Sequence, residues 1–400
     1  MGAFQDSVVM KFGGTSVNGA SKMMNAARRI IEKRKDGCPV AVVVSAMGKT
    51  TDRLIDMARE AGGATPDGRE VDHLLATGEQ QSAALLALTL NAMGYPACSF
   101  TGVQAGVLAE GPWGEGRITS VNPLRIRDTI AGGTVAVVAG FQGVTRGGDV
   151  ITLGRGGSDL SAVALAAALH AKECHILTDV SGIYTADPRR VPDAKKLRSV
   201  SWDECIEMGV CGARVMQPRS VEMACRLGMP IHLASSDTAQ DGTWISGPDV
   251  SERPKITAVA SDERICRLTL PPGGKAPWQE ISEAFSKSEI VTVAITTHPC
   301  DAIYVRGDQG GRAQSLCRSL LDADVPLSDG FASVSVIGHG VGNHPEILNG
   351  VLRVLARCAC SLYLVFSSGS SVRCILPGEA AAGAVLALHE AFIEKEGDNA

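Results

Sequence analysis

The sequence predicts an α/β fold with a mainly parallel sheet over residues 1–250, followed by two small ferredoxin-like domains. The first observation is that short apolar runs alternate with helical patterns in this region. The second is that the runs are almost continuously hydrophobic, which is typical of strands covered on both faces of a sheet. The third is that a strand–helix–strand–strand–helix order occurs twice in the rest of the chain.

Strand and helix candidates alternate through residues 1–250. We expect strands at 8–12, 40–46, 97–101, 135–141, 174–179 and 231–235, and helices at 21–35, 52–61, 78–93, 158–171 and 215–227. Gly37 and Gly94 follow two of these helices, where a glycine can end a helix in the left-handed conformation.

A polar stretch at 247–254 is typical of a linker, and the pattern changes beyond it. We expect strands at 256–270, 290–296, 301–305, 331–337, 361–366 and 371–376, and helices at 277–286, 311–323, 344–357 and 379–395. The sequence therefore predicts three domains, at 1–250, 256–328 and 329–400. The strand at 256–260 belongs either to the first or to the second small domain.

Composition excludes several classes of protein. The chain of 400 residues is 45% hydrophobic with a formal charge of −5, as in soluble globular proteins. It has no basic cluster and only 4% aromatic residues, so we expect no nucleic-acid partner. No apolar run approaches about 18 residues and no signal peptide pattern is present, so we expect no membrane association. The twelve cysteines are scattered without a C-x-x-C pair, which favours reduced thiols and a cytoplasmic location.

The heptapeptide Lys-Phe-Gly-Gly-Thr-Ser-Val at 11–17 lies between the first predicted strand and the first predicted helix. Its glycines allow backbone N–H groups to approach an anion closely. Lys11 adds a positive charge, and the start of the helix adds the positive end of a dipole. The combination suits a polyphosphate, although no G-x-x-x-x-G-K-[ST] P-loop occurs in the chain.

This heptapeptide resembles the N-terminal signature of aspartate kinases, which belong to the amino-acid kinase family. Further matching motifs follow predicted strands or open predicted helices, where ligands bind in open α/β sheets. The C-terminal units resemble the tandem ACT domains of the same enzymes, most clearly over 334–345. The other motifs lie at 45–52, 77–82, 139–143, 152–159 and 178–189.

The resemblance implies transfer of the γ-phosphoryl group of ATP to the β-carboxylate of L-aspartate, with Mg²⁺ arriving on ATP and no metal ligand from the protein. A carboxylate is already ionised at neutral pH, so the obstacle is repulsion between two anions. We expect Lys11 to neutralise the phosphates and the N–H groups of Gly13 and Gly14 to cradle them. Thr15 and Ser16 are expected to supply further donors.

Recognition of an amino acid needs complementary groups. Arg155 is suited to bind the α-carboxylate with two hydrogen bonds, and Glu79 to bind the α-ammonium. We expect Gly156 to let the ligand approach, Ser158 to cap a helix, and by resemblance Asp159 to orient Lys11 and the substrate. The resemblance adds Ser45, Thr51 and Phe141 around the substrate.

The resemblance also implies a region that binds the adenosine and phosphates. It consists of Thr178, Asp179, Tyr184, Asp187 and Arg189. Arg214 stands where relatives usually carry lysine, and keeps the charge while changing its geometry.

The C-terminal half departs from relatives that respond to feedback. Residues 270–275, Leu-Pro-Pro-Gly-Gly-Lys, stand where those relatives have an Asp-x-Pro-Gly-like turn, and Pro345-Glu346 stands where Pro-Gly is usual. We therefore expect weak or no inhibition by lysine and threonine. We also expect self-association through the ACT-like domains as a homodimer or larger oligomer.

Two alternatives stay open. One is a non-catalytic amino-acid sensor or partner subunit on the same fold, and the other is a kinase for an analogue of aspartate. A sensor is expected to lose kinase residues and keep effector loops. The chain instead keeps Lys11, Glu79, Arg155 and Asp159, which favours the kinase.

Overall fold

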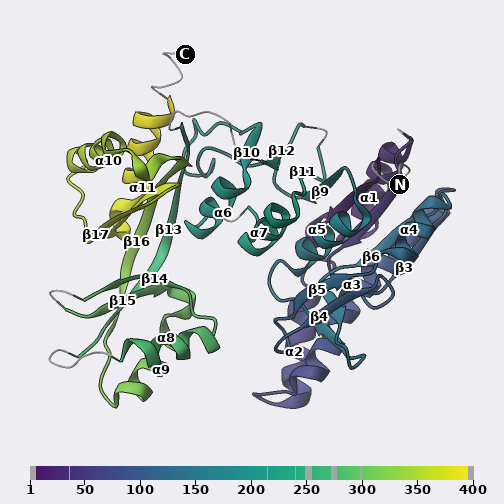
Figure 1. The fold of residues 1–400 in the computed structure, drawn as a ribbon, viewed down its shortest axis with the longest axis horizontal. Coiled ribbons are helices and arrows are strands. Elements are labelled where there is room, and N and C mark those ends of the chain that lie inside the picture. The colour runs from purple at the N-terminus through teal and green to yellow at the C-terminus, as the bar shows by residue number, and fades with distance from the viewer. Residues whose placement is uncertain are drawn as a thin grey trace. The chain divides into compact units, whose positions relative to one another are not determined.

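The computed structural model describes residues 6–35, 37–213, 215–238, 240–247, 255–271, 277–297 and 300–394. The chain forms two compact units (Figure 1). The first runs to Ile183 and also contains 196–209 and 214–250. The second contains the chain from 251 together with Tyr184–Lys195 and Val210–Ala213. Two short segments that precede residue 250 in the sequence thus pack with the C-terminal unit.

An eight-stranded sheet forms the centre of the first unit, in the order β10-β12-β11-β9-β1-β2-β6-β3. Its pairings are parallel except that of β11 with β12. Every residue of β1, β2 and β6 is buried, as the almost continuously apolar runs predict. The predicted α/β fold is therefore confirmed. The strands are β1 (Val8–Phe12), β2 (Val40–Val44), β3 (Ala97–Phe100), β6 (Val135–Ala139), β9 (Glu173–Thr178), β10 (Ser199–Ser201), β11 (Ile231–Ser235) and β12 (Thr243–Ser246).

All five predicted helices of the first unit are present, two of them with a different start, and α4 and α6 are helices that the sequence-based expectations lack. The helix predicted at 78–93 begins at Gly68, because the Asp67 side chain caps it by accepting the Glu70 N–H. The helix predicted at 215–227 begins at Pro218, since proline suits the first turn of a helix. The helices are α1 (Ala20–Lys35), α2 (Thr50–Gly62), α3 (Gly68–Ala92), α4 (Leu124–Ala131), α5 (Gly157–Leu169), α6 (Trp202–Val210) and α7 (Pro218–Leu227).

A four-stranded sheet in the first unit is absent from the sequence-based expectations. Its order is β5-β4-β7-β8, with β4 (Val107–Glu110), β5 (Arg117–Val121), β7 (Gln142–Val144) and β8 (Val150–Thr152). These strands are short, and their small core consists of Ala109, Ile151 and Leu153. The sheet matters for function because β8 leads directly into the glycine-rich loop before α5.

The second unit is built on one six-stranded antiparallel sheet, ordered β14-β15-β13-β16-β18-β17. Two long strands at its centre, β13 (Lys255–Thr269) and β16 (Leu327–His339), pair along most of their length, and so join the two β-α-β-β-α repeats. Residues 255–260 pair with 335–339, in the second repeat. The outer strands are β14 (Thr292–Thr296), β15 (Ala302–Arg306), β17 (Leu364–Ser368) and β18 (Ser371–Pro377).

Two pairs of helices accompany this sheet, α8 (Trp278–Lys287) with α9 (Gly310–Leu321), and α10 (Pro345–Arg357) with α11 (Ala381–His389). The helix predicted at 379–395 is shorter, because α11 ends at His389 and a π-helical turn, Glu390–Glu394, follows it. Figure 1 shows the two pairs at opposite ends of the unit. Most of the predicted linker, at 248–254, and most of the altered turn, at 272–275, lie outside the described residues.

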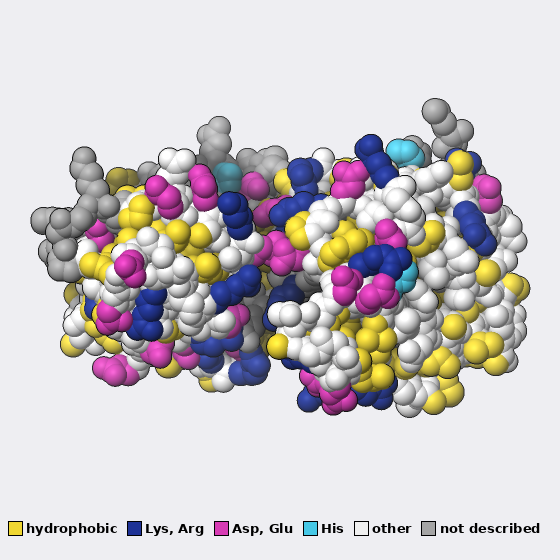
Figure 2. Space-filling view, turned by 90° about the horizontal axis from the view of Figure 1, so that it is seen from below, with side chains coloured by type: hydrophobic (Ala, Val, Ile, Leu, Met, Phe, Trp, Pro, Cys, Tyr) yellow, Lys and Arg dark blue, Asp and Glu magenta, His cyan; other side chains and the backbone are white. Residues whose placement is uncertain are grey.

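The surface carries charges of both signs. On the face drawn in Figure 2, acidic and basic side chains alternate over the described part of the chain instead of gathering into one basic patch. No helix among the described residues combines the length and the apolar character that crossing a membrane requires.

Candidate active site

An ion pair between a buried lysine and a half-buried aspartate lies at the carboxyl end of a central strand of the first unit. Lys11 is the penultimate residue of β1, and its Nζ lies 2.7 Å from Oδ1 of Asp159 in the first turn of α5. Lys11 is 8% exposed, so little water competes for its ammonium group. The expected orientation of Lys11 by Asp159 agrees with this geometry, since a short ion pair fixes the position of the charge.

The turn after β1 brings the backbone close to the loop that follows β2. A Cβ on Gly14 would lie 2.5 Å from the Ala46 carbonyl oxygen, so only glycine fits there. The Gly13 N–H donates to the Leu177 carbonyl at 2.9 Å. It is therefore not free for a phosphate, and the expected role of this N–H is corrected. Ser16 is buried, whereas Thr15 is exposed.

Glu79 provides a buried carboxylate with one oxygen left over. It lies inside α3, not at the start of a helix as expected, and is 3% exposed. Its Oε1 accepts the Ala46 N–H at 3.0 Å, and its Oε2 has no hydrogen-bond partner within the described chain. Burial raises the pKa of Glu79 to about 7, although the Ala46 N–H and the charge of Lys11 oppose the rise. An ammonium group from a ligand would complete this environment.

The glycine-rich loop between β8 and α5 presents Arg155 to solvent. Gly154 and Gly156 on either side have φ of 71° and 72°, a conformation that favours glycine. A Cβ on Gly156 would also lie 2.5 Å from Cγ of Gln217. Arg155 is exposed and pairs with no side chain that the structure describes. The loop thus holds a forked cation whose donors are available to a ligand.

Two side chains that sequence reasoning missed anchor this loop. Asp72 is fully buried and accepts hydrogen bonds from the N–H and Oγ1 of Thr152, at 2.9 and 2.7 Å. Arg219 donates from Nη1 to the Leu153 carbonyl at 3.1 Å. No local pattern marks Asp72, which stands between Val71 and His73 with Glu70 nearby, so its burial could not be predicted from the sequence.

Phe141 has a strained backbone beside the same loop. Its φ of 68° is uncommon for a large side chain. The conformation is held from both sides, since its N–H donates to Ser161 Oγ at 3.1 Å and its carbonyl accepts the Leu153 N–H at 2.9 Å. Strain of this kind concentrates at functional sites, which is consistent with the expected place of Phe141 at the substrate.

Ser45 directly follows β2, whereas Ser158 and Thr51 lie in the first turns of α5 and α2. Ser158 is buried but does not cap α5, because the capping position is Gly156 and no side chain bonds there. This corrects the capping expectation. The Ser45 N–H donates to the Phe12 carbonyl at 3.1 Å, next to the turn after β1. Thr51 is half-buried in the first turn of α2.

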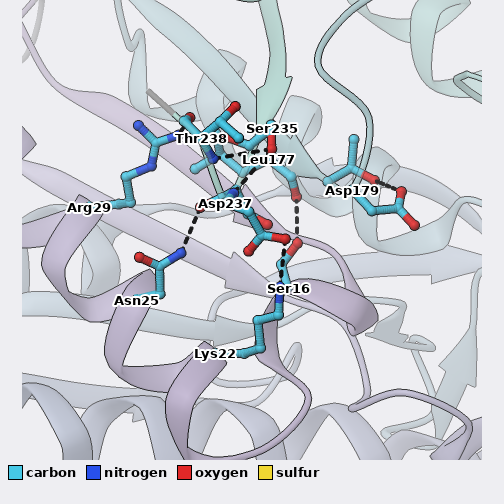
Figure 3. Close-up of polar contacts among 11 residues, drawn as sticks. Ser16, Lys22, Asn25, Arg29, Leu177, Asp179, Ser235, Asp237 and Thr238 are labelled. Atoms are coloured by element: carbon cyan, nitrogen blue, oxygen red, sulfur yellow. Dashed lines mark hydrogen bonds and ion pairs between the residues drawn. The ribbon is translucent and has the colours of Figure 1, made fainter. Parts of the chain in front are cut away.

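The carboxyl ends of β9 and β11 form a second polar region (Figure 3). Thr178 Oγ1 donates to Asp179 Oδ1 at 3.1 Å, and the Ser236 N–H donates to the Thr178 carbonyl at 2.7 Å. The loop after β11 is fastened by three residues on one face of α1 that sequence reasoning missed. They are Lys22, which pairs with Asp237 at 2.5 Å, Asn25, which donates to Ser236 O at 2.9 Å, and Arg29, which donates to Ser235 O and Thr238 O.

The remaining residues of the expected nucleotide region belong to the second unit. They are Tyr184, Asp187 and Arg189, in the segment Tyr184–Lys195. Arg189 donates from Nε and Nη2 to the two oxygens of Asp187, at 2.9 and 2.7 Å, and these bonds hold the pKa of Asp187 below its usual value. Arg214 lies outside the described residues.

Known proteins are similar to this chain in sequence and in fold. The profile of the Amino acid kinase family matches residues 6–235. The chain is 39% identical to an aspartokinase of Bacillus sp. (strain MGA3), over 96% of this chain and 97% of that one. It is 41% identical to an aspartokinase of Mycolicibacterium smegmatis, over 96% of each. A crystal structure of E. coli aspartokinase III with aspartate and ADP (R-state) superimposes with a TM-score of 0.81 at 26% identity, over 96% of this chain and 99% of that one. The chain belongs to the aspartokinases of the amino acid kinase family.

Proposed function

We propose that this chain transfers the γ-phosphoryl group of ATP to the β-carboxylate of L-aspartate. The product is 4-phospho-L-aspartate, at the first step of aspartate-derived amino-acid biosynthesis. One observation carries the proposal: Lys11 is fixed by Asp159 at the end of β1, while Glu79 Oε2 and Arg155 lack partners within the described chain. The relative from E. coli was solved with aspartate and ADP, the ligands that such groups suit.

The amino acid is held by its two charged α-groups. Arg155 binds the α-carboxylate through its fork, and Glu79 accepts the α-ammonium. An ammonium beside Glu79 favours its ionised form, so substrate binding itself completes the charge of the site. Ser45, Thr51, Phe141, Gly156 and Ser158 are proposed to line the position of the substrate.

Phosphoryl transfer then needs charge more than proton removal. The β-carboxylate attacks in its ionised form, so no general base is required. Lys11 neutralises the phosphates and the negative charge that builds on the transferring group. Asp159 keeps the Lys11 ammonium in place. Mg²⁺ is proposed to arrive on ATP, because phosphate oxygens supply its ligands.

We propose that the turn after β1 and a second group of residues bind the nucleotide. Gly13, Gly14, Thr15 and Ser16 lie at the phosphates, with Gly13 acting through its lack of a side chain. The adenosine and outer phosphates are assigned to Thr178, Asp179, Tyr184, Asp187, Arg189 and Arg214.

Location, assembly and regulation complete the proposal. All twelve cysteines are free thiols, which supports a reducing compartment such as the cytoplasm. The edge strands β14 and β17 each pair on one side only within the described sheet, so we propose a homodimer through the ACT-like domains that covers one of them. The altered sequence at 270–275 supports weak or no inhibition by lysine and threonine.

The test is trapping of the acyl phosphate with hydroxylamine, in reactions of the full chain with Mg-ATP and a panel of amino acids. We expect hydroxamate with L-aspartate and a much smaller signal with glutamate or asparagine. A larger signal with an aspartate analogue would identify the chain as a kinase for that analogue. ATP-independent binding of amino acids with no hydroxamate at all would instead identify a sensor.

A further inference from the structure

His389, the last residue of α11, is fully buried and lies between two polar side chains. Its Nε2 lies 2.9 Å from Oγ1 of Thr185, and its Nδ1 lies 2.8 Å from Oε1 of Glu394. The two partners come from opposite halves of the sequence, 204 and five residues away. The proposed phosphoryl transfer does not use this imidazole.

The hydrogen-bond partners define where the protons lie in this group. A carboxylate only accepts, so His389 Nδ1 carries a proton and donates it to Glu394. Thr185 Oγ1 already accepts the Lys195 N–H at 2.9 Å. The Thr185 hydroxyl proton is therefore free to be donated to Nε2 of a neutral His389. Every polar atom of the imidazole is then satisfied, which its complete burial requires.

The π-helical turn after α11 makes this arrangement possible. In a π turn the backbone bonds from residue i to i+5, which brings residues five apart onto one side of the helix. His389 and Glu394 have this spacing, and the turn spans Glu390–Glu394. A continued α-helix would rotate Glu394 away from the imidazole.

Thr185 is the point where the segment Tyr184–Lys195 is closed and attached. Its N–H donates to the Lys195 carbonyl at 2.9 Å, so the two ends of the segment meet. Its carbonyl accepts the Val259 N–H from β13 at 2.8 Å. Ala186 and Val191 of the same segment are buried in the core formed around α10 and α11. The segment is thus attached to the C-terminal sheet through Val259 and to α11 through His389.

We propose that Glu394, His389 and Thr185 form a positioning relay that sets the conformation of the Asp187–Arg189 pair for binding of nucleotide. This inference rests on the proposed function, in which Asp187 and Arg189 contact ATP. The end of helix α11, in the ACT-like region, is then part of the apparatus that determines affinity for ATP. His389 is a positioning residue and touches no substrate.

The test compares kinetic constants of full-length variants. Thr185→Val keeps the shape of the side chain and removes the hydroxyl. We expect the KM for ATP to rise roughly 3- to 10-fold, as loss of one buried hydrogen bond implies, with kcat and the KM for aspartate within about 2-fold. Glu394→Ala should act in the same direction, whereas Glu394→Gln keeps an acceptor for Nδ1–H and should restore a nearly normal KM for ATP.

Ser335→Ala is the matched control, because Ser335 is a fully buried hydroxyl of the same unit with no hydrogen-bond partner in the described residues. Its KM for ATP should not change. Should Thr185→Val fail to fold, the pair at Glu394, which is partly exposed, decides the question. Lower melting temperatures with an unchanged KM for ATP in Glu394→Ala would overturn the relay. In that case wild-type turnover still supports the proposed kinase, whereas absence of turnover in the wild type would instead contradict the proposed function.

Discussion

The two ends of the eight-stranded sheet bury charged side chains in different ways. At the amino end of β9, Oε1 of Glu173 is hydrogen-bonded to His175 at 2.7 Å and to Lys33 at 3.0 Å, and these basic partners lower its pKa to about 2. At the carboxyl end of the sheet, Glu79 keeps one oxygen without a partner in the described chain, and its pKa is raised to about 7. Arg155 likewise lacks a partner there.

The glutamate at the amino end is therefore paired with two basic side chains, whereas the one at the carboxyl end accepts only a backbone N–H. The cluster at the amino end continues from His175 to His232, whose ring stacks on Trp244 with centroids 4.5 Å apart. These side chains pair with one another, and a network of this kind stabilises the fold. A buried charge with an unused acceptor is costly unless a ligand completes it, which is why the carboxyl end is the better candidate for a binding site.

The largest expected effect comes from removing the ammonium at the carboxyl end. Lys11→Ala should lower kcat by roughly 100-fold or more, because the charge on the transferring phosphoryl group loses its fixed partner. The measurement is steady-state turnover at saturating ATP and aspartate. The control is Lys33→Ala, which removes the lysine that pairs with Glu173. This variant should keep kcat within about 2-fold of the wild type while its melting temperature falls. Near-normal turnover of Lys11→Ala would exclude Lys11 from the mechanism.

A smaller effect is expected from changing the shape of the cation in the glycine-rich loop. Arg155→Lys keeps the charge but loses the fork that binds a carboxylate with two hydrogen bonds. The KM for aspartate should rise roughly 10-fold, with the KM for ATP little changed. Arg146→Lys provides a control, since Arg146 is exposed and pairs with Glu110 at 2.8 Å on the surface. Equal effects of the two substitutions on the KM for aspartate would contradict the assignment.

Binding of aspartate should also depend on pH through Glu79. Its pKa of about 7 leaves much of it protonated in slightly acidic solution, and only the ionised form pairs with the α-ammonium. The KM for aspartate should therefore fall as pH rises through about 7, approaching a tenfold change per pH unit well below that value. Glu79→Gln should bind aspartate more weakly and remove this dependence. A KM that stays constant across neutral pH in the wild type would argue against the role.

The central strands and the first turn could be predicted from sequence for a physical reason. A strand buried on both faces is almost entirely apolar, so β1 and β2 can be recognised in the sequence as runs of hydrophobic residues. Lys11 stands out because a charge at the end of such a strand needs a function or a partner.

Features that depend on distant contacts could not be predicted. The helix α3 conceals Glu79 in its middle, because Gly78 permits close packing against Ala46 and does not break the helix. The segment Tyr184–Lys195 precedes the predicted linker but packs with the C-terminal unit through Val259 and His389. No local pattern marks either arrangement.

The smallest expected effects concern stability, and they have opposite signs at the two ends of the sheet. The folded-state pKa of Glu79 is raised from 4.5 to about 7, so between these values the folded protein binds more protons than the unfolded chain. The contribution of Glu79 to the free energy of unfolding must then decrease as pH rises through that window. The pKa of Glu173 is lowered from 4.5 to about 2, so its contribution is present above about 4.5 and is lost as pH falls towards 2.

Melting temperatures of two matched variants, measured without substrate, test this difference. Glu79→Gln should gain stability relative to the wild type as pH rises from about 5 to about 8, because it removes a carboxylate that is costly to ionise. Glu173→Gln should be less stable than the wild type at neutral pH, and the gap should narrow in acid as the native glutamate is protonated. If both variants changed stability with the same dependence on pH, the distinction between a carboxylate paired with basic side chains and a buried one without such a pair would not hold. At saturating aspartate, the wild type should instead gain stability relative to Glu79→Gln as pH rises, because the ligand binds the ionised form of Glu79. The result for Glu173→Gln should not change.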